Sequence, residues 1–369
     1  MVNQDRLIEK FIEYVKVSSE SRDEIRFQQL LVNELKDMGF EIFLDESIKV
    51  KSGSNASNII AKYTSDPSED YIMLSAHMDT VTPGNDIIPI IEGDYIKSDG
   101  STILGGDDKG GIITIMEAVR TLKEHKLLMH NLEIVFTICE EVGLLGSKYL
   151  DYDMIKSKKA IVLDSSGHPG NIIIKGPGQN KIDFKITGKT AHAGICPEEG
   201  INAIQIASEA ISNMNLLRID EETTANIGKI SGGSATNIVC DSVIVNCEAR
   251  SLSLEKLQKQ TDHMLEEMTK SCDKFGGKLD FEVTRSYNPL VVDENSELVK
   301  EISSAMRNLD ISPILKASGG GSDTNNYFEN GIEAINLAVG MTNVHTKDEC
   351  IKISDLVKMT ELIIELIKK

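Results

Sequence analysis

The chain has 369 residues, a length that suits one large domain or two ordinary ones, and its 40% hydrophobic content is typical of a globular protein. The formal net charge of −19 disfavours binding to nucleic acid or to an anionic membrane, and no apolar run approaches the roughly 18 residues of a membrane span. Charges interrupt the apolar residues of the N-terminal segment MVNQDRLIEKFIEYVKV, unlike in a signal peptide, and none of the six cysteines stands in a Cys-x-x-Cys pair. We therefore expect a cytoplasmic protein.

The first half of the chain is typical of an α/β domain with a mostly parallel sheet. Apolar residues repeat with helical spacing in the N-terminal segment and over 22–38, where Gly39 is placed to end the helix. A further helix is predicted over Gly111–His125. Four short apolar runs are continuous rather than alternating, which is typical of strands covered on both faces: 58–63, 71–76, 132–138 and 160–163.

The pattern changes after Gly176-Pro177-Gly178. The order becomes strand, helix, strand, strand, helix, strand, as in a ferredoxin-like βαββαβ unit, over 181–187, 200–215, 224–231, 242–250, 254–270 and 278–285. The α/β pattern resumes near residue 292, with a helix over 295–308, a strand over 335–339 and a last helix that Ser354 is placed to cap. We predict one α/β domain flanked by helices, residues 1–176 and 292–369, split by an inserted α+β domain, residues 177–291.

Side chains that can bind metals follow the predicted strands at their carboxyl ends. They are His77 and Asp79 after 71–76, Glu140 and Glu141 after 132–138, Asp164 after 160–163, and His345 a short loop after 335–339. Asp107 lies in the glycine-framed turn GGDDKGG, just before a predicted helix. In open α/β sheets ligands bind outside the carboxyl ends of the strands, so we expect these side chains to meet in one crevice.

Each of these residues alone has a simpler explanation. A histidine after a strand is usually structural, aspartates before a helix usually cap it, and acids after a strand usually belong to a solvated loop or turn. Together, however, several acids would raise one another's pKa values unless cations lay among them. Two histidines with carboxylates favour zinc, with cobalt or manganese as alternatives, and their number suits two ions about 3.5–4 Å apart that share one carboxylate. The motif HExxH is absent, which argues against a single zinc site on one helix.

These motifs resemble those of the dizinc exopeptidase family that includes peptidase T, glutamate carboxypeptidase and succinyl-diaminopimelate desuccinylase. The resemblance runs from the first helix to the last and is nearest to the peptidase T branch, the tripeptide aminopeptidases. It rests on AHMDTV (76–81), GGDDKGG (105–111), EEVGLLGS (140–147), LDSSG (163–167), TAHAG (190–194) and VHT (344–346). It implies a zinc-exopeptidase fold in which residues 177–291 form a lid or dimerisation domain.

The resemblance also implies a role for each residue of the predicted crevice. His77, Asp107 and Asp164 would hold one zinc ion, and Asp107, Glu141 and His345 would hold the other, with Asp107 as the bridge. A cis peptide bond would join Asp107 to Asp108, Asp79 would orient the His77 imidazole, and Glu140 would be the general base. The family pattern is broken after Asp164, where Ser-Ser-Gly replaces an acid-rich continuation, and this departure puts substrate preference in doubt.

In the inserted domain the resemblance makes His192 the donor to the reaction's oxyanion, acting after domain closure or across a homodimer. Arg250 in EARS and Asn237 in GGSATNIV would bind the substrate backbone or its carboxylate. Gly320 in GGGSD could offer a backbone N–H to a substrate carboxylate, and the motif lacks the Gly-Lys-Ser/Thr ending of a phosphate loop. The plainer readings are a surface-loop histidine, a solvated arginine and a flexible connection.

Three functions remain open from the sequence. The first is an aminopeptidase that removes the N-terminal residue of short peptides, tripeptides above all, with water activated by two zinc ions and Glu140 as the base. The second is another amide hydrolase of the same family, such as a dipeptidase, a carboxypeptidase or an N-acyl-amino-acid deacylase. The third is a non-catalytic metal-binding scaffold, which the complete set of ligands and the base disfavours.

Overall fold

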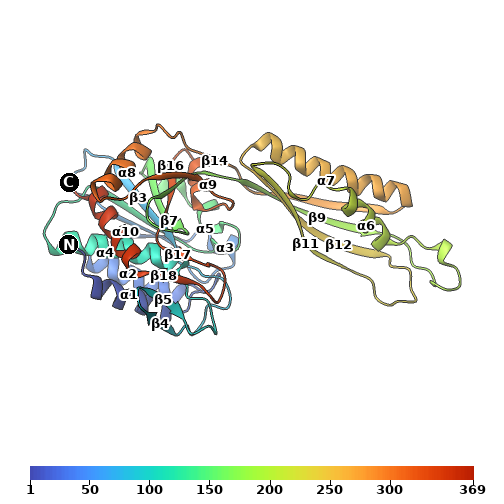
Figure 1. The fold of residues 1–369 in the computed structure, drawn as a ribbon, viewed down its shortest axis with the longest axis horizontal. Helices are drawn as coiled ribbons and strands as arrows, with labels where there is room; N and C mark the ends of the chain where they lie inside the picture. The colour runs from blue at the N-terminus through green and yellow to red at the C-terminus, as the bar shows by residue number, and fades with distance from the viewer. The chain divides into compact units, whose positions relative to one another are not determined.

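The computed structural model of the chain describes residues 1–369, apart from the side chain of Val50. The structure divides into two units (Figure 1). The first unit comprises Met1–Lys175, Val291–Ser318 and Ser322–Lys369, and the second comprises Gly176–Leu290 with Gly319–Gly321. The short segment 319–321, which we expected in the first domain, therefore groups with the second unit.

A nine-stranded mixed sheet forms the centre of the first unit. Its strands run in the order β1-β2-β6-β3-β7-β16-β8-β14, and β15 pairs with β8. The middle strands β6, β3, β7 and β16 are parallel to one another, whereas β1, β2 and β8 join antiparallel. The strand bounds are β1 Glu41–Asp45, β2 Asn58–Tyr63, β3 Tyr71–His77, β6 Asn131–Thr137, β7 Lys159–Ser165, β8 Asn171–Gly176, β14 Leu290–Val291, β15 Ile314–Ala317 and β16 Glu333–Ala338.

Helices cover both faces of this sheet. Tyr327 of α9 packs in a buried cluster with Ala160 and Val162 of β7, while Leu163 of the same strand faces Gly111 of α4 on the other side. The helices of the first unit are α1 Gln4–Lys16, α2 Ile25–Asp37, α3 Lys49–Ser52, α4 Gly106–Glu124, α5 Leu145–Lys148, η1 Tyr152–Met154, α8 Glu297–Asn308, α9 Asp323–Glu329 and α10 Ile353–Ile367. Because the central strands are buried on both faces, their apolar runs are continuous, and the predicted α/β fold is confirmed.

The ends of two helices test the predicted caps. Gly39 has φ +79° directly after the C-cap of α2, the left-handed conformation that glycine adopts easily, as expected. Ser354 was predicted to cap α10, and this is wrong, because Lys352 stands at the N-cap position. The Ser354 hydroxyl instead donates to Asp94 Oδ2 at 2.6 Å, a partner 260 residues away.

A second, four-stranded sheet also belongs to the first unit. Its strands follow the order β17-β18-β5-β4, with bounds β17 Met341–Thr342, β18 Cys350–Lys352, β5 Tyr95–Ser98 and β4 Pro89–Glu92. The loop between β17 and β18 contains His345. This small sheet therefore joins the segment before α4 to the segment that carries His345.

The second unit is a five-stranded antiparallel sheet with two long helices packed against one face. Strand order is β10-β11-β12-β9-β13. Its elements are β9 Gly178–Thr187, η2 Pro197–Glu199, α6 Ala203–Asn213, β10 Leu217–Arg218, β11 Thr223–Gly232, β12 Ser242–Ser251, α7 Leu254–Phe275 and β13 Lys278–Tyr287. Apart from the short β10, these elements follow the expected order of strand, helix, strand, strand, helix and strand. The core brings Phe184 of β9 together with Met264 and Met268 of α7.

Among the described residues no helix combines the length and the apolar character needed to cross a bilayer.

Candidate metal centre

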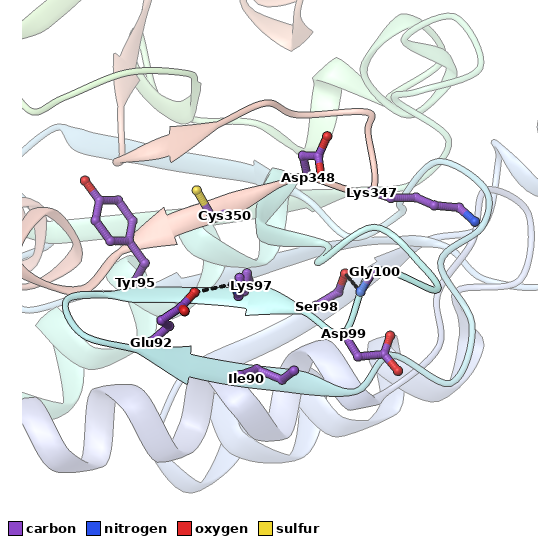
Figure 2. A pocket seen from close by; sticks show the side chains of 10 residues that line it. All are labelled: Ile90, Glu92, Tyr95, Lys97, Ser98, Asp99, Gly100, Lys347, Asp348 and Cys350. Atoms are coloured by element: carbon purple, nitrogen blue, oxygen red, sulfur yellow. Dashed lines mark hydrogen bonds and ion pairs between the residues drawn. The ribbon is translucent and has the colours of Figure 1, made fainter.

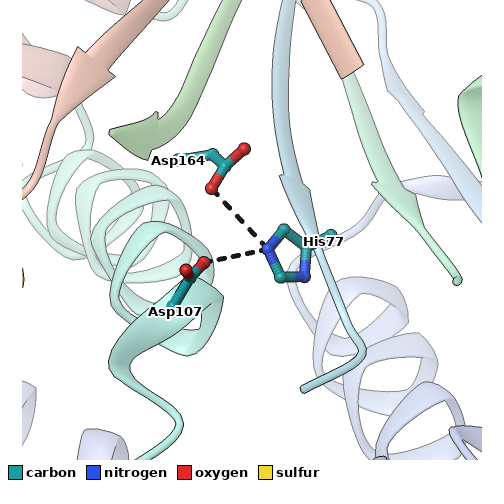
Figure 3. A group of neighbouring side chains, drawn as sticks. All are labelled: His77, Asp107 and Asp164. Carbon is teal, nitrogen blue, oxygen red and sulfur yellow. Dashed lines mark hydrogen bonds and ion pairs between the residues drawn. The ribbon is translucent and has the colours of Figure 1, made fainter. Parts of the chain in front are cut away.

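The first group of possible ligands lies where β3, β7 and α4 meet. His77 is the last residue of β3 and is 1% exposed. Its Nε2 lies 3.0 Å from Asp107 Oδ1 and 3.6 Å from Asp164 Oδ1 (Figure 3). These three side chains come from segments far apart in the sequence, and their potential ligand atoms all lie within 4.8 Å of one another.

A second group shares Asp107 with the first. His345 Nε2 lies 3.2 Å from Asp107 Oδ2 and 3.0 Å from Glu141 Oε1. Asp107 therefore directs one carboxylate oxygen toward each histidine, Oδ1 toward His77 and Oδ2 toward His345. The structure thus brings together all five predicted metal ligands, in two groups joined by one carboxylate.

The glycine-framed turn before α4 gives Asp107 its place. The Asp107–Asp108 peptide bond is cis, as the resemblance implied. A Cβ at Gly111 would lie 2.1 Å from the carbonyl oxygen of Leu163, so only glycine allows α4 to approach the end of β7 this closely. Asp108 is fully buried, and its carboxylate accepts hydrogen bonds from the backbone N–H groups of His77 at 3.2 Å and Gly111 at 3.1 Å.

Asp79 holds both His77 and the turn after β6. His77 Nδ1 lies 2.9 Å from the main-chain oxygen of Asp79, which can only accept, and 3.5 Å from its carboxylate. The carboxylate accepts closer hydrogen bonds from the Ser21 hydroxyl at 2.6 Å and from the backbone N–H groups of Glu140 at 2.9 Å and Glu141 at 3.2 Å. The main-chain oxygen is thus the nearer partner of the imidazole, and the carboxylate mainly fixes the two glutamates.

Burial and mutual repulsion dominate the electrostatics of the acids. Burial raises the pKa of Asp164 to about 7. Burial and then the charge of Asp164 raise the pKa values of Asp108 and Glu140 well above their ordinary range. Such a cluster of acids favours a bound cation, because a nearby positive charge would stabilise the ionised carboxylates.

The two histidines favour their protonated, charged forms, because carboxylates surround them. The nearby carboxylates of Asp107 and Glu141 raise the pKa of His345 to about 10. Although burial acts in the other direction, the hydrogen bonds from His345 and His77 hold the pKa of Asp107 below its usual range. The buried Glu141 Oε1 makes no hydrogen bond, although it lies 3.0 Å from His345 Nε2. An unpartnered carboxylate oxygen among imidazole nitrogens and further carboxylates fits a site for divalent cations.

The remaining predicted site residues belong to the second unit. His192 is exposed, and its Nδ1 accepts the backbone N–H of Gly194 at 3.2 Å. Arg250 is partly exposed and pairs with Glu248 at 3.0 Å. Asn237 is exposed, and Gly320 lies in the segment that groups with this unit. Their roles in substrate binding and oxyanion stabilisation stay predictions.

Three further buried carboxylates surround the centre, and the sequence alone assigns no side-chain role to any of them. Besides Asp108, these are Asp323, which accepts from the hydroxyls of Thr137 and Ser147, and Glu349, which accepts from three backbone N–H groups before α4. Asp108 stands beside Asp107 in GGDDKGG, and Glu349 follows His345 by four residues. Asp323 ends the GGGSD motif, for which the sequence leaves both a carboxylate-binding segment and a flexible connection open. Proximity in sequence to the recognised motifs was the only available signal.

A groove on the small sheet opens beside the loop of His345. It has a volume of about 680 Å³, and residues of β4, β5 and β18 line it together with Lys347 and Asp348 (Figure 2). Lys97 of β5 pairs with Glu92 across its floor. Its lining includes no residue of the two ligand groups, so the groove is separate from the candidate metal centre.

Comparisons with known proteins identify the family of the chain. The model of peptidase family M20/M25/M40 matches residues 73–369. The crystal structure of aminopeptidase PepT from Bacillus cereus ATCC 10987 is 42% identical with a TM-score of 0.92, and the match covers 99% of this chain and 98% of that chain. A tripeptidase (SAV1512) from Staphylococcus aureus is 38% identical with a TM-score of 0.96, covering 100% of this chain and 98% of that chain.

A more distant structure shows the likeness of the fold alone. The YXEP protein of Bacillus subtilis, a dinuclear metal binding peptidase from the M20 family, is 17% identical with a TM-score of 0.74, covering 98% of this chain and 97% of that chain. The family match and the two nearer structures show that the chain belongs to peptidase family M20/M25/M40, on its peptidase T branch, and that it is a metallopeptidase.

Proposed function

We propose that this peptidase is an aminopeptidase that removes the N-terminal residue of short peptides, tripeptides above all, with two zinc ions; cobalt or manganese could replace zinc. The observation that carries the proposal is Asp107, whose two oxygens are directed at two different histidines, His77 and His345. The names of the similar Bacillus cereus aminopeptidase and Staphylococcus aureus tripeptidase support the substrate class, and the dinuclear site of the YXEP protein supports the number of ions.

The two ligand groups define which residues would hold the ions. His77, Asp107 and Asp164 would hold one, and Asp107, Glu141 and His345 the other. When bound, such ions act as Lewis acids that polarise a peptide carbonyl and lower the pKa of water. His77 Nδ1 points at a main-chain acceptor, so it carries the hydrogen of the neutral ring and leaves the Nε2 lone pair for a cation.

Glu140 is the proposed general base. It belongs to neither ligand group, it is 8% exposed, and its backbone N–H is held by Asp79. Burial raises its pKa well above the ordinary value for a glutamate, and a raised pKa makes the ionised carboxylate a stronger proton acceptor. We propose that Glu140 accepts a proton from the attacking water and delivers it to the leaving amine.

Residues of the second unit would complete the site. We propose that the imidazole of His192 donates to the oxyanion that forms on the scissile carbonyl. Arg250, Asn237 and Gly320 would bind the backbone or carboxylate of a short peptide. A homodimer formed through the second unit would let His192 act on the partner's site, and closure of the second unit is the alternative route.

We further propose that the enzyme works in the cytoplasm. All six cysteines are free thiols in the structure, as suits a reducing compartment.

A direct test compares a tripeptide that has a free amine with its N-acetylated form, each with zinc or cobalt supplied. We expect cleavage of the free peptide between its first and second residues, loss of activity with a chelator, and recovery on adding metal. Cleavage of only the acetylated peptide would instead identify a deacylase or another amide hydrolase. Binding of metal with no hydrolysis of any di-, tri- or tetrapeptide would indicate a scaffold protein.

A further inference from the structure

Glu349 is a buried acid on the loop that carries His345, and no part of the proposed reaction uses it. It lies four residues after His345, directly before β18, and is 1% exposed. Its neighbours Asp348 and Cys350 line the outward-facing groove of the small sheet (Figure 2). Because successive residues of an extended segment point to opposite sides, Glu349 points inward, toward the turn before α4.

Glu349 accepts three backbone hydrogen bonds from that turn. Its Oε2 lies 2.8 Å from the N–H nitrogens of both Leu104 and Gly105, and its Oε1 lies 2.9 Å from the N–H nitrogen of Asp107. Gly105 is the N-cap residue of α4 and has no side chain to cap the helix. A carboxylate from 242 to 245 residues away therefore satisfies N–H groups that the helix start would leave unpaired.

The fit around this carboxylate is close. A Cβ at Gly106 would lie 3.0 Å from Glu349 Oε1, so glycine at this position leaves room for the contact. The bonded N–H of Asp107 belongs to the residue that directs one oxygen at each histidine. One side chain thus links the segment that supplies the shared aspartate to the segment that supplies His345.

We infer that Glu349 is a positioning residue that sets the distance between Asp107 and His345, and so determines the affinity of the second ligand group for its ion. The inference rests on the proposed two-ion function. His77 and Asp164 come from strands that Glu349 does not contact, so the first group should depend on Glu349 less. If Glu349 were only a helix cap, its loss would lower stability and leave the relative affinities of the two groups unchanged.

The test is a zinc titration of Glu349→Gln by calorimetry, starting from metal-free full-length protein, with cobalt absorption spectra as a second readout. Partners that orient metal ligands typically contribute about 10–100-fold to metal affinity. We expect one of the two binding events to lose at least about tenfold in affinity and the other to change by less. For tripeptide cleavage we expect kcat to fall more than KM rises, with partial recovery in excess zinc.

Glu133→Gln is the matched control. Glu133 is a fully buried acid of β6 that also accepts backbone N–H groups, from Lys156 and Ser157, but it lies toward the opposite end of the strand from the ligand groups. The Glu133→Gln variant should be less stable than the wild type but should bind both ions with unchanged affinity. Asp348 is an exposed neighbour of Glu349 in the same loop, and Asp348→Asn should change neither the stability nor the metal affinities.

Three outcomes are distinguishable. Wild-type protein that binds fewer than two ions, or cleaves no peptide, contradicts the proposed function itself. Two ions in the wild type with unchanged affinities in Glu349→Gln overturn the inference about Glu349 alone. If Glu349→Gln does not fold, Glu349→Asp replaces it in the test, because aspartate keeps the negative charge on a shorter side chain. Selective weakening of one binding event in this variant supports the inference. Two unchanged affinities overturn it.

Discussion

Most candidate functional residues of the first unit are buried, apart from the exposed His345, whereas those of the second unit are exposed or partly exposed. In the first unit His77, Asp79 and Glu140 are at most 8% exposed, and each is held by defined backbone or side-chain contacts. In the second unit His192 and Asn237 are exposed. Charges in a buried site interact strongly and keep their geometry, whereas exposed groups are free to meet a substrate. The comparison supports the proposal that the metal ligands and the base act in the first unit, and that exposed groups of the second unit bind the substrate and its oxyanion.

The strongest test of the buried centre is Asp107→Asn. Because Asp107 serves both ligand groups, the variant should lose at least one ion, and with it several kcal/mol of transition-state stabilisation, which is about a thousandfold or more in kcat. Metal analysis and tripeptide assays measure both effects. Asp99→Asn, an exposed aspartate of the same unit, is the control, and equal activity of the two variants would contradict the assignment.

Alanine variants of the two neighbouring glutamates, Glu140 and Glu141, should both lose activity but should differ in metal content. Glu140→Ala should lose about 10²- to 10⁴-fold in kcat while keeping its metal, because the general base is removed and the ligands remain. Glu141→Ala should lose metal as well, because Glu141 belongs to the second group. Normal hydrolysis by Glu140→Ala would show that another residue moves the proton.

His192→Ala tests whether the second unit takes part in the chemistry. Loss of a donor to an oxyanion typically lowers kcat by about 10²- to 10³-fold, and metal content should stay the same. His263→Ala is the matched control, since His263 is another histidine of the second unit, where its Nε2 accepts the backbone N–H of Asn215. Equal activity of the two variants would confine the chemistry to the first unit.

Asp164 should make the metal-free protein less stable as pH rises from about 4 to about 7. Burial raises the pKa of Asp164 to about 7, so the folded protein holds a proton there that the unfolded chain releases near pH 4. The hydrogen bond from His77 lowers the pKa of Asp164, whereas the negative charges of Asp107 and Asp323 raise it. In urea unfolding, the stability of metal-free Asp164→Asn relative to the wild type should therefore increase as pH rises. A difference independent of pH would contradict the burial of an acid there.

The smallest expected effects come from helix caps in each unit. Ser296 caps α8 in the first unit and Ser253 caps α7 in the second, each by accepting a backbone N–H. Replacing either by alanine should cost about 1 kcal/mol of unfolding free energy without changing metal affinity. A change in metal affinity in either variant would show that the caps, and not only the ligand segments, shape the centre.

The sequence predicted those features that depend on neighbouring residues. Continuous apolar runs located β3, β6 and β7, and parallel strands necessarily bring their carboxyl ends, with His77, Glu141 and Asp164, to one edge of the sheet. It could not predict features that depend on distant partners. Ser354 has the residue type and position of a helix cap, but its hydroxyl donates to the distant Asp94. The residues around Glu349 likewise give no sign that its hydrogen-bond donors lie more than 240 positions away.

The central claim is that Asp107 binds two ions at once. The most direct measurement is a crystal structure of the zinc-loaded protein, with anomalous scattering recorded on both sides of the zinc edge. Two peaks, one near His77 and Asp164 and the other near Glu141 and His345, each in contact with a different oxygen of Asp107, are the predicted result. A single peak, or two peaks that do not share Asp107, would contradict it.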